Sequence, residues 1–216
     1  MPILGLATYG GVDLQFTAAD IAAIRFTVLQ AILSAALSVA LAISASRALA
    51  RQNFKGREVL ISILSAPFIL PVIVAISGVL FIFGREGVFN QFLGSLGQET
   101  VSIYGLSGIL LVHVFFNLPL AIRILLFGWG AIPIEHHRVA RGLKLNAWTR
   151  FKIIELPMLV SRVPAATAII FVICLSSFAV ALLLGGGPRA TTVELAIYQA
   201  FRFDFDIAKA GQPALV

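Results

Sequence analysis

Long stretches without charge constrain the fold of this chain more than any other sequence feature. Uncharged runs of 21, 26, 23 and 26 residues separate Arg25 from Arg47, Glu58 from Arg85, Glu99 from Arg123, and Arg162 from Arg189. About 20 apolar residues cross the hydrocarbon core of a membrane as a helix, so each run is long enough to span it. A helix also satisfies its backbone hydrogen bonds within one segment, as lipid requires. We therefore predict an all-α polytopic membrane helix bundle, with spans at about 26–46, 59–83, 106–126 and 163–184.

The distribution of basic residues predicts the orientation of the spans. Eleven of the 16 Lys and Arg residues flank or fill the first and third loops between spans: Arg47, Arg51, Lys55, Arg57, Arg123, Arg138, Arg141, Lys144, Arg150, Lys152 and Arg162. Short cytoplasmic loops carry the excess of Lys and Arg, so both loops are predicted to face the cytoplasm. Residues 1–24 then form a periplasmic segment. The net charge of +6 is explained without a nucleic-acid partner.

Within the spans, a few positions predict how the helices bend and pack. Ser34, Ser38, Ala42 and Ser46 recur every four residues and predict close packing against another helix. Pro67 and Pro71 predict a kink, which either shapes a pathway or is simply accommodated by neighbouring helices. The run Gly185 to Pro188 predicts the end of the fourth span.

Two polar residues in the third span have two possible roles. His113 and Asn117 lie one helical turn apart, so both fall on one face of the helix. They could line a substrate pathway, or they could hydrogen bond to another helix, which is the commoner use of polar groups in a span.

The loop from Ile134 to Leu159 is too long for a simple connection between spans. Asn146 is a favourable helix cap, and Trp148, Phe151 and Ile154 follow at three-residue spacing as an apolar stripe. We predict two short helices around a bend, with a basic and aromatic face that binds a protein partner. The alternative is that the two aromatic residues pack beneath the loop against the membrane helices.

This loop resembles the coupling loop of the binding-protein-dependent permeases of ATP-binding-cassette importers, whose pattern is Glu-Ala-Ala, three residues, Gly, nine residues, Ile-x-Leu-Pro. Counting back from Leu156 and Pro157, Ile154 matches the Ile and Ala140 matches the second Ala. The sequence departs from the pattern elsewhere, with Arg138 in place of Glu, Val139 in place of Ala and Lys144 in place of Gly. Gly142 is therefore the residue expected to supply the bend.

Three further stretches resemble the amino-terminal half of thiamine transport permeases: LPVIVAISGVL from Leu70, YGLSGILLVHVFFNLPLAIR from Tyr104, and LGGGPRATTVELAIYQA from Leu184. The resemblance implies a transmembrane domain over residues 25–209 and a truncated tail at 210–216. It also implies a transporter subunit with no cofactor, no metal site and no catalytic residue. The implied partners are a separate ATPase subunit, a periplasmic thiamine-binding protein, a second permease half and the lipid bilayer.

The resemblance also assigns roles to individual residues. The implied ATPase-coupling residues are Arg138, Ala140, Gly142, Lys144, Asn146, Trp148, Phe151, Ile154, Leu156 and Pro157. For a cationic substrate such as thiamine, aromatic faces could stabilise the charge, which adds Phe115 and Phe116 to His113 and Asn117 as candidate pathway residues.

Other functions remain open at this stage. No Gly-x-x-x-x-Gly-Lys pattern occurs, so the chain has no P-loop ATPase motif, and the predicted spans contain no Asp or Glu for a proton relay. The alternatives are a ferric iron permease of the same family, a proton-coupled carrier that uses His113, and an inactive fragment. The last follows because the family usually has one more helix before the first span and another span after Asp206.

Overall fold

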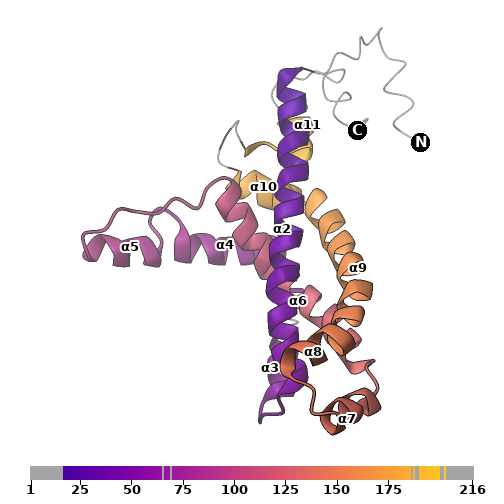
Figure 1. Cartoon of the computed structure of the whole chain (residues 1–216). Coiled ribbons are helices and arrows are strands. Elements are labelled where there is room, and N and C mark those ends of the chain that lie inside the picture. The colour runs from indigo at the N-terminus through magenta and orange to yellow at the C-terminus, as the bar shows by residue number, and fades with distance from the viewer. Residues whose placement is uncertain are drawn as a thin grey trace. The chain divides into compact units, whose positions relative to one another are not determined.

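The computed structural model describes residues 17–64, 66–68, 70–185, 187, 190–199 and 202. Its regular elements within those residues are all helical, which confirms the predicted all-α class: α2 Ala18–Arg51, α3 Arg57–Ile63, η1 Ala66–Phe68, α4 Val72–Phe83, α5 Val88–Ser95, α6 Leu106–Gly130, α7 Ile134–Gly142, α8 Ala147–Arg150, η2 Phe151–Glu155, α9 Leu156–Leu175, α10 Phe178–Leu184 and α11 Val193–Gln199 (Figure 1). The first 16 residues and the predicted tail at 210–216 lie outside the described residues.

Among the residues that the structure describes, four stretches of helix are long and apolar enough to cross a membrane: Ala18–Arg51, Val72–Ser95, Leu106–Gly130 and Ala147–Leu175. The number agrees with the four uncharged runs of the sequence, but the helix bounds differ from the predicted spans in three places.

The first helix begins earlier than the apolar run. Thr17 and Asp20 form a reciprocal capping box, in which Thr17 N donates to Asp20 Oδ2 at 2.8 Å and Asp20 N donates to Thr17 Oγ1 at 3.2 Å. This cap satisfies backbone donors that would otherwise be exposed at the helix start. Residues 18–24, predicted to belong to a periplasmic segment, are therefore the first two turns of α2.

The predicted span at 59–83 is not one helix. It is divided into α3, η1 and α4, with Pro67 inside η1 and Pro71 as the N-cap of α4. Each proline removes a backbone donor, and its ring disfavours helical geometry in the preceding residue. The predicted kink is thus a complete break, and the second membrane-length stretch is Val72–Ser95.

The predicted span at 163–184 is also interrupted, between α9 and α10. Gln30 Nε2 donates to the Cys174 carbonyl at 2.9 Å, and this carbonyl would accept from residue 178 in a continuous helix. A side chain that inserts into the backbone ladder in this way ends or kinks a helix. The predicted helix end at Gly185 is confirmed, since α10 ends at Leu184.

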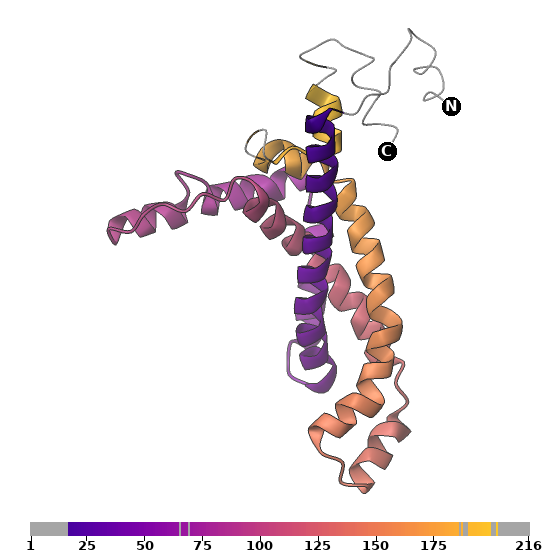
Figure 2. The same ribbon diagram turned by 45° about the horizontal axis from the view of Figure 1, so that its top comes forward.

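The described chain divides into two compact units. Of the described residues, the first unit comprises those within 17–32, 71–112 and 174–202. Within it α10 contacts both α4 and α11, and Val193 N at the start of α11 donates to Thr27 Oγ1 of α2 at 3.0 Å. In both views α5 continues in the direction of α4, and the following segment runs back to α6 (Figures 1 and 2).

The second unit comprises residues 33–70 and 113–173 and holds the predicted coupling loop. The small residues of α2 form its packing face, since Ser34, Ser38, Ala42 and Ser46 are all 0% exposed. Trp129 Nε1 of α6 donates to Ser46 Oγ at 3.1 Å. The predicted close packing of this stripe is therefore confirmed.

Candidate functional site

The predicted coupling loop, residues 134–159, contains two short helices, as expected from the sequence. The helix α7 follows Pro133, and the chain turns back before α8 begins (Figures 1 and 2). Asn146 is the N-cap of α8, and its side chain accepts a hydrogen bond from Thr149 N at 2.7 Å. This bond satisfies one of the free donors at the helix start, so the predicted cap is confirmed.

The bend between the two helices is made by Lys144, not by Gly142. Lys144 has φ of 49°, in the left-handed region, whereas Gly142 is the last residue of α7. Leu145 N donates to Ala140 O and Lys144 N donates to Arg141 O, both at 3.0 Å. These two bonds define a Schellman motif, whose left-handed position is usually glycine. Lys144 also stands at the glycine of the family pattern, which explains why that pattern has glycine there.

The outer surface of the loop is apolar as well as basic. The Trp148 side chain is 71% exposed, Leu143 is 66% exposed and Val139 is 60% exposed. The rings of Trp148 and Phe151 stack, with centroids 5.7 Å apart and planes at 27°. A large aromatic side chain that protrudes from a loop is typical of an anchor for a protein partner.

The other residues of the predicted coupling set lie at different depths in the loop. Ala140 is buried and Ile154 is half-buried, so these two fix the loop to its own unit. The remaining members are exposed: Arg138, Gly142, Lys144, Asn146, Leu156 and Pro157.

Phe151 faces inward, toward α2. The guanidinium of Arg47 lies 4.9 Å from the centroid of its ring. The two aromatic residues that were predicted as one stripe therefore differ, since Trp148 is exposed and Phe151 contacts a membrane helix.

Glu155 connects the loop to the end of α2. Its side chain is 1% exposed, and its Oε2 accepts a hydrogen bond from Arg47 Nε at 2.7 Å. Arg51 NH2 pairs with the other carboxylate oxygen, Oε1. The two arginine side chains are 34% and 35% exposed. A buried carboxylate is tolerated only when it is paired and hydrogen bonded, and this pairing holds η2 against α2.

The sequence interpretation missed Glu155, although a signal was present. Only Glu135 and Glu155 are acidic between Glu99 and Glu194, a stretch that holds eight basic residues. An isolated acid in such a basic region predicts an ion pair, but it does not say with which arginine.

A π-helical turn, η2, joins α8 to α9 without a break. Pro157, the second residue of α9, has no backbone N–H, so the carbonyl of Ile153 within η2 cannot make the normal helical bond. Single π-turns inside helices are frequently found at functional sites. The loop is therefore continuous with the membrane helix α9 through a helical backbone.

The loop also carries a positive electrostatic field. Burial lowers the pKa of His137 on α7, and the nearby cations of Arg150, Arg51 and Arg141 lower that pKa further. A field that disfavours a charged His137 is of the sign that attracts acidic groups.

The four candidate pathway residues do not lie in one environment. His113 and Asn117 are each 3% exposed, and His113 Nδ1 is hydrogen bonded to Ser34 Oγ at 2.9 Å. This burial favours the second role considered for them, hydrogen bonding between helices. Phe115 is 44% exposed, and its ring meets that of Phe116 edge to face at 5.5 Å. The Phe115 side chain is thus accessible to a neighbouring molecule, whereas the His113 and Asn117 side chains are buried within the helix bundle.

Comparison with known proteins bears on the resemblance noted in the sequence. No protein-family model matches the chain. Over 194 residues, 89% of this chain, it is 49% identical to the thiamine transport system permease protein ThiP of Escherichia coli K12, and 39% identical to that of Haemophilus influenzae. The chain is a homologue of thiamine transport permeases. It spans only about a third of their length, 36% in both cases.

Solved structures confirm the fold of this homologue. A bacterial ABC transporter that imports the acidic polysaccharide alginate superposes with a TM-score of 0.82, covering 99% of this chain and 82% of that chain, at 18% identity. The same alginate transporter in complex with an alginate-bound periplasmic protein gives a TM-score of 0.78. At such identity the match supports the fold alone, which is that of an ABC importer permease. The homologues and the four apolar helices together indicate a multi-pass inner-membrane protein.

Proposed function

We propose that this chain forms part of the membrane pathway of an ATP-driven bacterial importer of thiamine or its phosphates. The observation that carries the proposal is the 49% identity to a thiamine transport system permease over 89% of the chain. An alignment of 194 residues at this identity takes in most of the chain, so it supports a shared mechanism and not only a shared fold.

In this proposal the loop from α7 to η2 binds a groove on a separate ATPase subunit. Trp148 is the central anchor, because it is 71% exposed and is the largest apolar side chain of the loop. Arg138, Lys144 and Lys152 surround it with positive charge. When the ATPase subunits close, the loop moves with them, and the Glu155 pairing and the continuous η2–α9 backbone transmit this motion to α2 and α9.

The proposed orientation places the loop in the cytoplasm and the start of α2 in the periplasm. A periplasmic thiamine-binding protein would deliver the substrate, and a second permease half would complete the pathway. Phe115 is the pathway residue that the geometry supports best, because its exposed ring can face a cation on the side open to the second half.

The test is substitution of Trp148 by Ala in the assembled transporter. We expect ATPase binding to weaken about 30-fold or more, as for a hot-spot residue worth at least about 2 kcal/mol, and thiamine uptake to fall with it. The matched control is Phe92→Ala, which removes a 59% exposed aromatic side chain from α5 in the other unit. Unchanged ATPase capture and uptake in Trp148→Ala would remove Trp148 from this role.

Two further measurements separate the alternatives. Labelled thiamine uptake should be inhibited by excess thiamine phosphates but not by ferric iron, and the reverse would favour an iron permease. Uptake should stop when the ATPase is inactivated, whereas a proton-coupled carrier would continue to transport. An inactive fragment would support no uptake with any partner half.

A further inference from the structure

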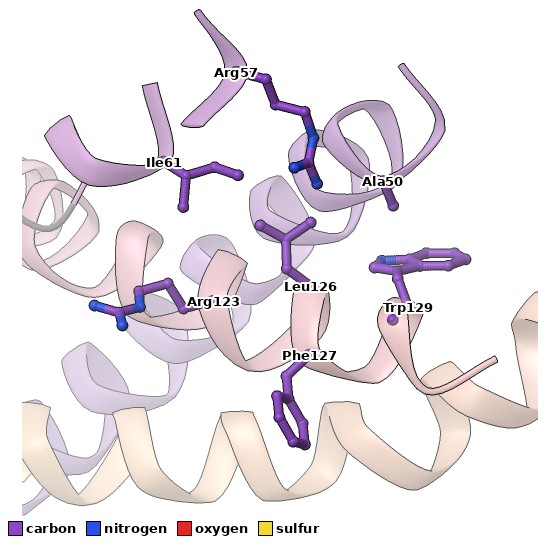
Figure 3. Close-up of a pocket in the computed structure, with 8 residues that line it drawn as sticks. Ala50, Arg57, Ile61, Arg123, Leu126, Phe127 and Trp129 are labelled. Carbon is purple, nitrogen blue, oxygen red and sulfur yellow. The ribbon is translucent and has the colours of Figure 1, made fainter. Parts of the chain in front are cut away.

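The second unit contains a pocket that the transport mechanism does not use. It has a volume of about 420 Å³ and is lined by Ala50, Arg57, Ile61, Arg123, Leu126, Phe127, Trp129 and Gly130. In Figure 3, Arg57 extends from α3 toward Leu126 on α6, while Arg123 and Trp129 lie on either side of Leu126 on the same helix. The pocket thus combines two guanidinium groups with apolar and aromatic walls.

The charge of this pocket is one-sided. None of the eight lining residues is acidic, and two are arginine. Arg57 Nε donates to the Leu49 carbonyl at 2.9 Å, and its NH1 pairs with Glu58 at 2.6 Å. The Glu58 side chain is 82% exposed, so this ion pair is solvated and weak, and the hydrogen bond to the Leu49 carbonyl is the contact that positions Arg57. A third arginine stands nearby, since Arg162 of α9 lies 5.9 Å from the centroid of the Phe127 ring.

The depth of the pocket matches the boundary between headgroups and acyl chains. Arg123 precedes the end of α6 at Gly130 by seven residues, which corresponds to about 10 Å along the helix axis. The Phe127 ring is 75% exposed, as expected of a side chain that faces lipid. Arginine at this depth extends toward the headgroups while its methylene stem stays in the apolar region.

From this geometry we propose that the pocket binds an anionic phospholipid of the inner leaflet. The phosphate lies between Arg57 and Arg123, and an acyl chain follows Ile61, Leu126 and Phe127. Basic pockets between membrane helices on the cytoplasmic side bind anionic headgroups by this combination of charge and apolar surface. A zwitterionic lipid fills the apolar part equally well but lacks the net charge that two arginines select.

Tryptophan fluorescence can read out this pocket directly. The chain has two tryptophans, Trp129 in the pocket and Trp148 on the loop. In a Trp148→Phe background, Trp129 alone reports contact with lipid. The chain is placed in phosphatidylcholine bilayers, and brominated phosphatidylglycerol or brominated phosphatidylcholine is titrated in as a quencher.

We expect brominated phosphatidylglycerol to quench Trp129 at a much lower mole fraction than brominated phosphatidylcholine. The double variant Arg57→Gln, Arg123→Gln should lose this preference by about 25-fold, because each basic side chain near an anionic surface contributes about a factor of five. Arg123→Lys keeps the charge and should keep most of the preference. Arg85→Gln removes one charge in the first unit and should leave the quenching unchanged.

Four outcomes would overturn the proposal. The first is equal quenching by the two lipids. The second is a double variant that keeps its preference while its helical content and thermal midpoint match those of the parent. The third is failure of the assembled transporter, with Trp148 intact, to retain phosphatidylglycerol in preference to phosphatidylcholine through purification, which would assign the pocket to a protein segment. Displacement of the lipid by excess inorganic phosphate would make it a site for free phosphate instead. None of these outcomes depends on which solute the importer carries.

Discussion

Glu155 accepts a hydrogen bond from Arg47 at 2.7 Å across 108 residues of sequence, and its carboxylate is 1% exposed. Arg51, one turn further along α2, pairs with the same carboxylate. The residue that precedes Leu156 and Pro157 of the coupling loop is therefore fixed to the end of a membrane helix. In the proposed mechanism, this pairing is the link by which a displacement of the loop reaches α2.

Removal of the Glu155 carboxylate should destabilise the second unit. We expect Glu155→Ala to lower the free energy of unfolding by about 2 kcal/mol, because two guanidinium groups lose their buried partner. The loss is limited because both arginine side chains are about one third exposed, so water replaces part of the lost hydrogen bonding. The measurement is equilibrium unfolding of the purified chain in mixed micelles titrated with sodium dodecyl sulfate. Glu58→Ala, at an exposed pair, is the control and should change the free energy by less than about 0.5 kcal/mol. Equal effects of the two variants would mean that the clamp does not stabilise the fold.

The left-handed conformation of Lys144 predicts a stabilising substitution. Lys144→Gly should raise the free energy of unfolding by up to about 1 kcal/mol, since a side chain in this region costs about 1–2 kcal/mol and glycine avoids that strain at some entropic cost. Gly142→Ala should also be stabilising or neutral, because Gly142 is helical and an added methyl group meets nothing within 4 Å. If Gly142→Ala were destabilising, the bend would have to lie at Gly142, which would contradict the structure.

Two serines on the same face of α2 should respond differently to loss of the hydroxyl group. Ser34→Ala should cost about 1 kcal/mol, since Ser34 Oγ is hydrogen bonded to His113. Ser38→Ala should be neutral or slightly stabilising, because Ser38 Oγ is buried without a hydrogen-bond partner among the described residues. Unfolding in mixed micelles again provides the comparison. An equal loss in both variants would show that the packing of the stripe, and not the Ser34–His113 bond, matters at Ser34.

The proposed orientation can be tested with cysteine labelling. Cys174 is the single native cysteine and is 0% exposed, so background reaction with a membrane-impermeant maleimide should be low. Trp148→Cys should react only in inside-out vesicles, and Arg85→Cys only in right-side-out vesicles. Labelling of position 148 from the outer side would show that the topology is the reverse of the proposed one, and the loop could then not bind a cytoplasmic ATPase.

Local sequence patterns were sufficient for the class of fold and for much of the loop. The four uncharged runs predicted four membrane-length helices because the bilayer sets the length of an apolar helix. Asn146 and the small-residue face of α2 were also correctly predicted, since a cap and a packing face depend on residues within one or two turns of each other. The resemblance to the family's coupling pattern predicted where the loop lies in the sequence, although Lys144 stands where that pattern has glycine.

Tertiary structure decided the features that depend on distant partners. The helix break before α10 requires Gln30, which lies 144 residues away from the carbonyl that it binds. The roles of Trp148 and Phe151 separated only when α2 brought Arg47 to one ring and left the other exposed. Glu155 was visible as an isolated acid in a basic region, but its function depends on which helix end it meets. A sequence specifies periodicity and caps locally, whereas the pairing of faces is settled only when the whole bundle packs.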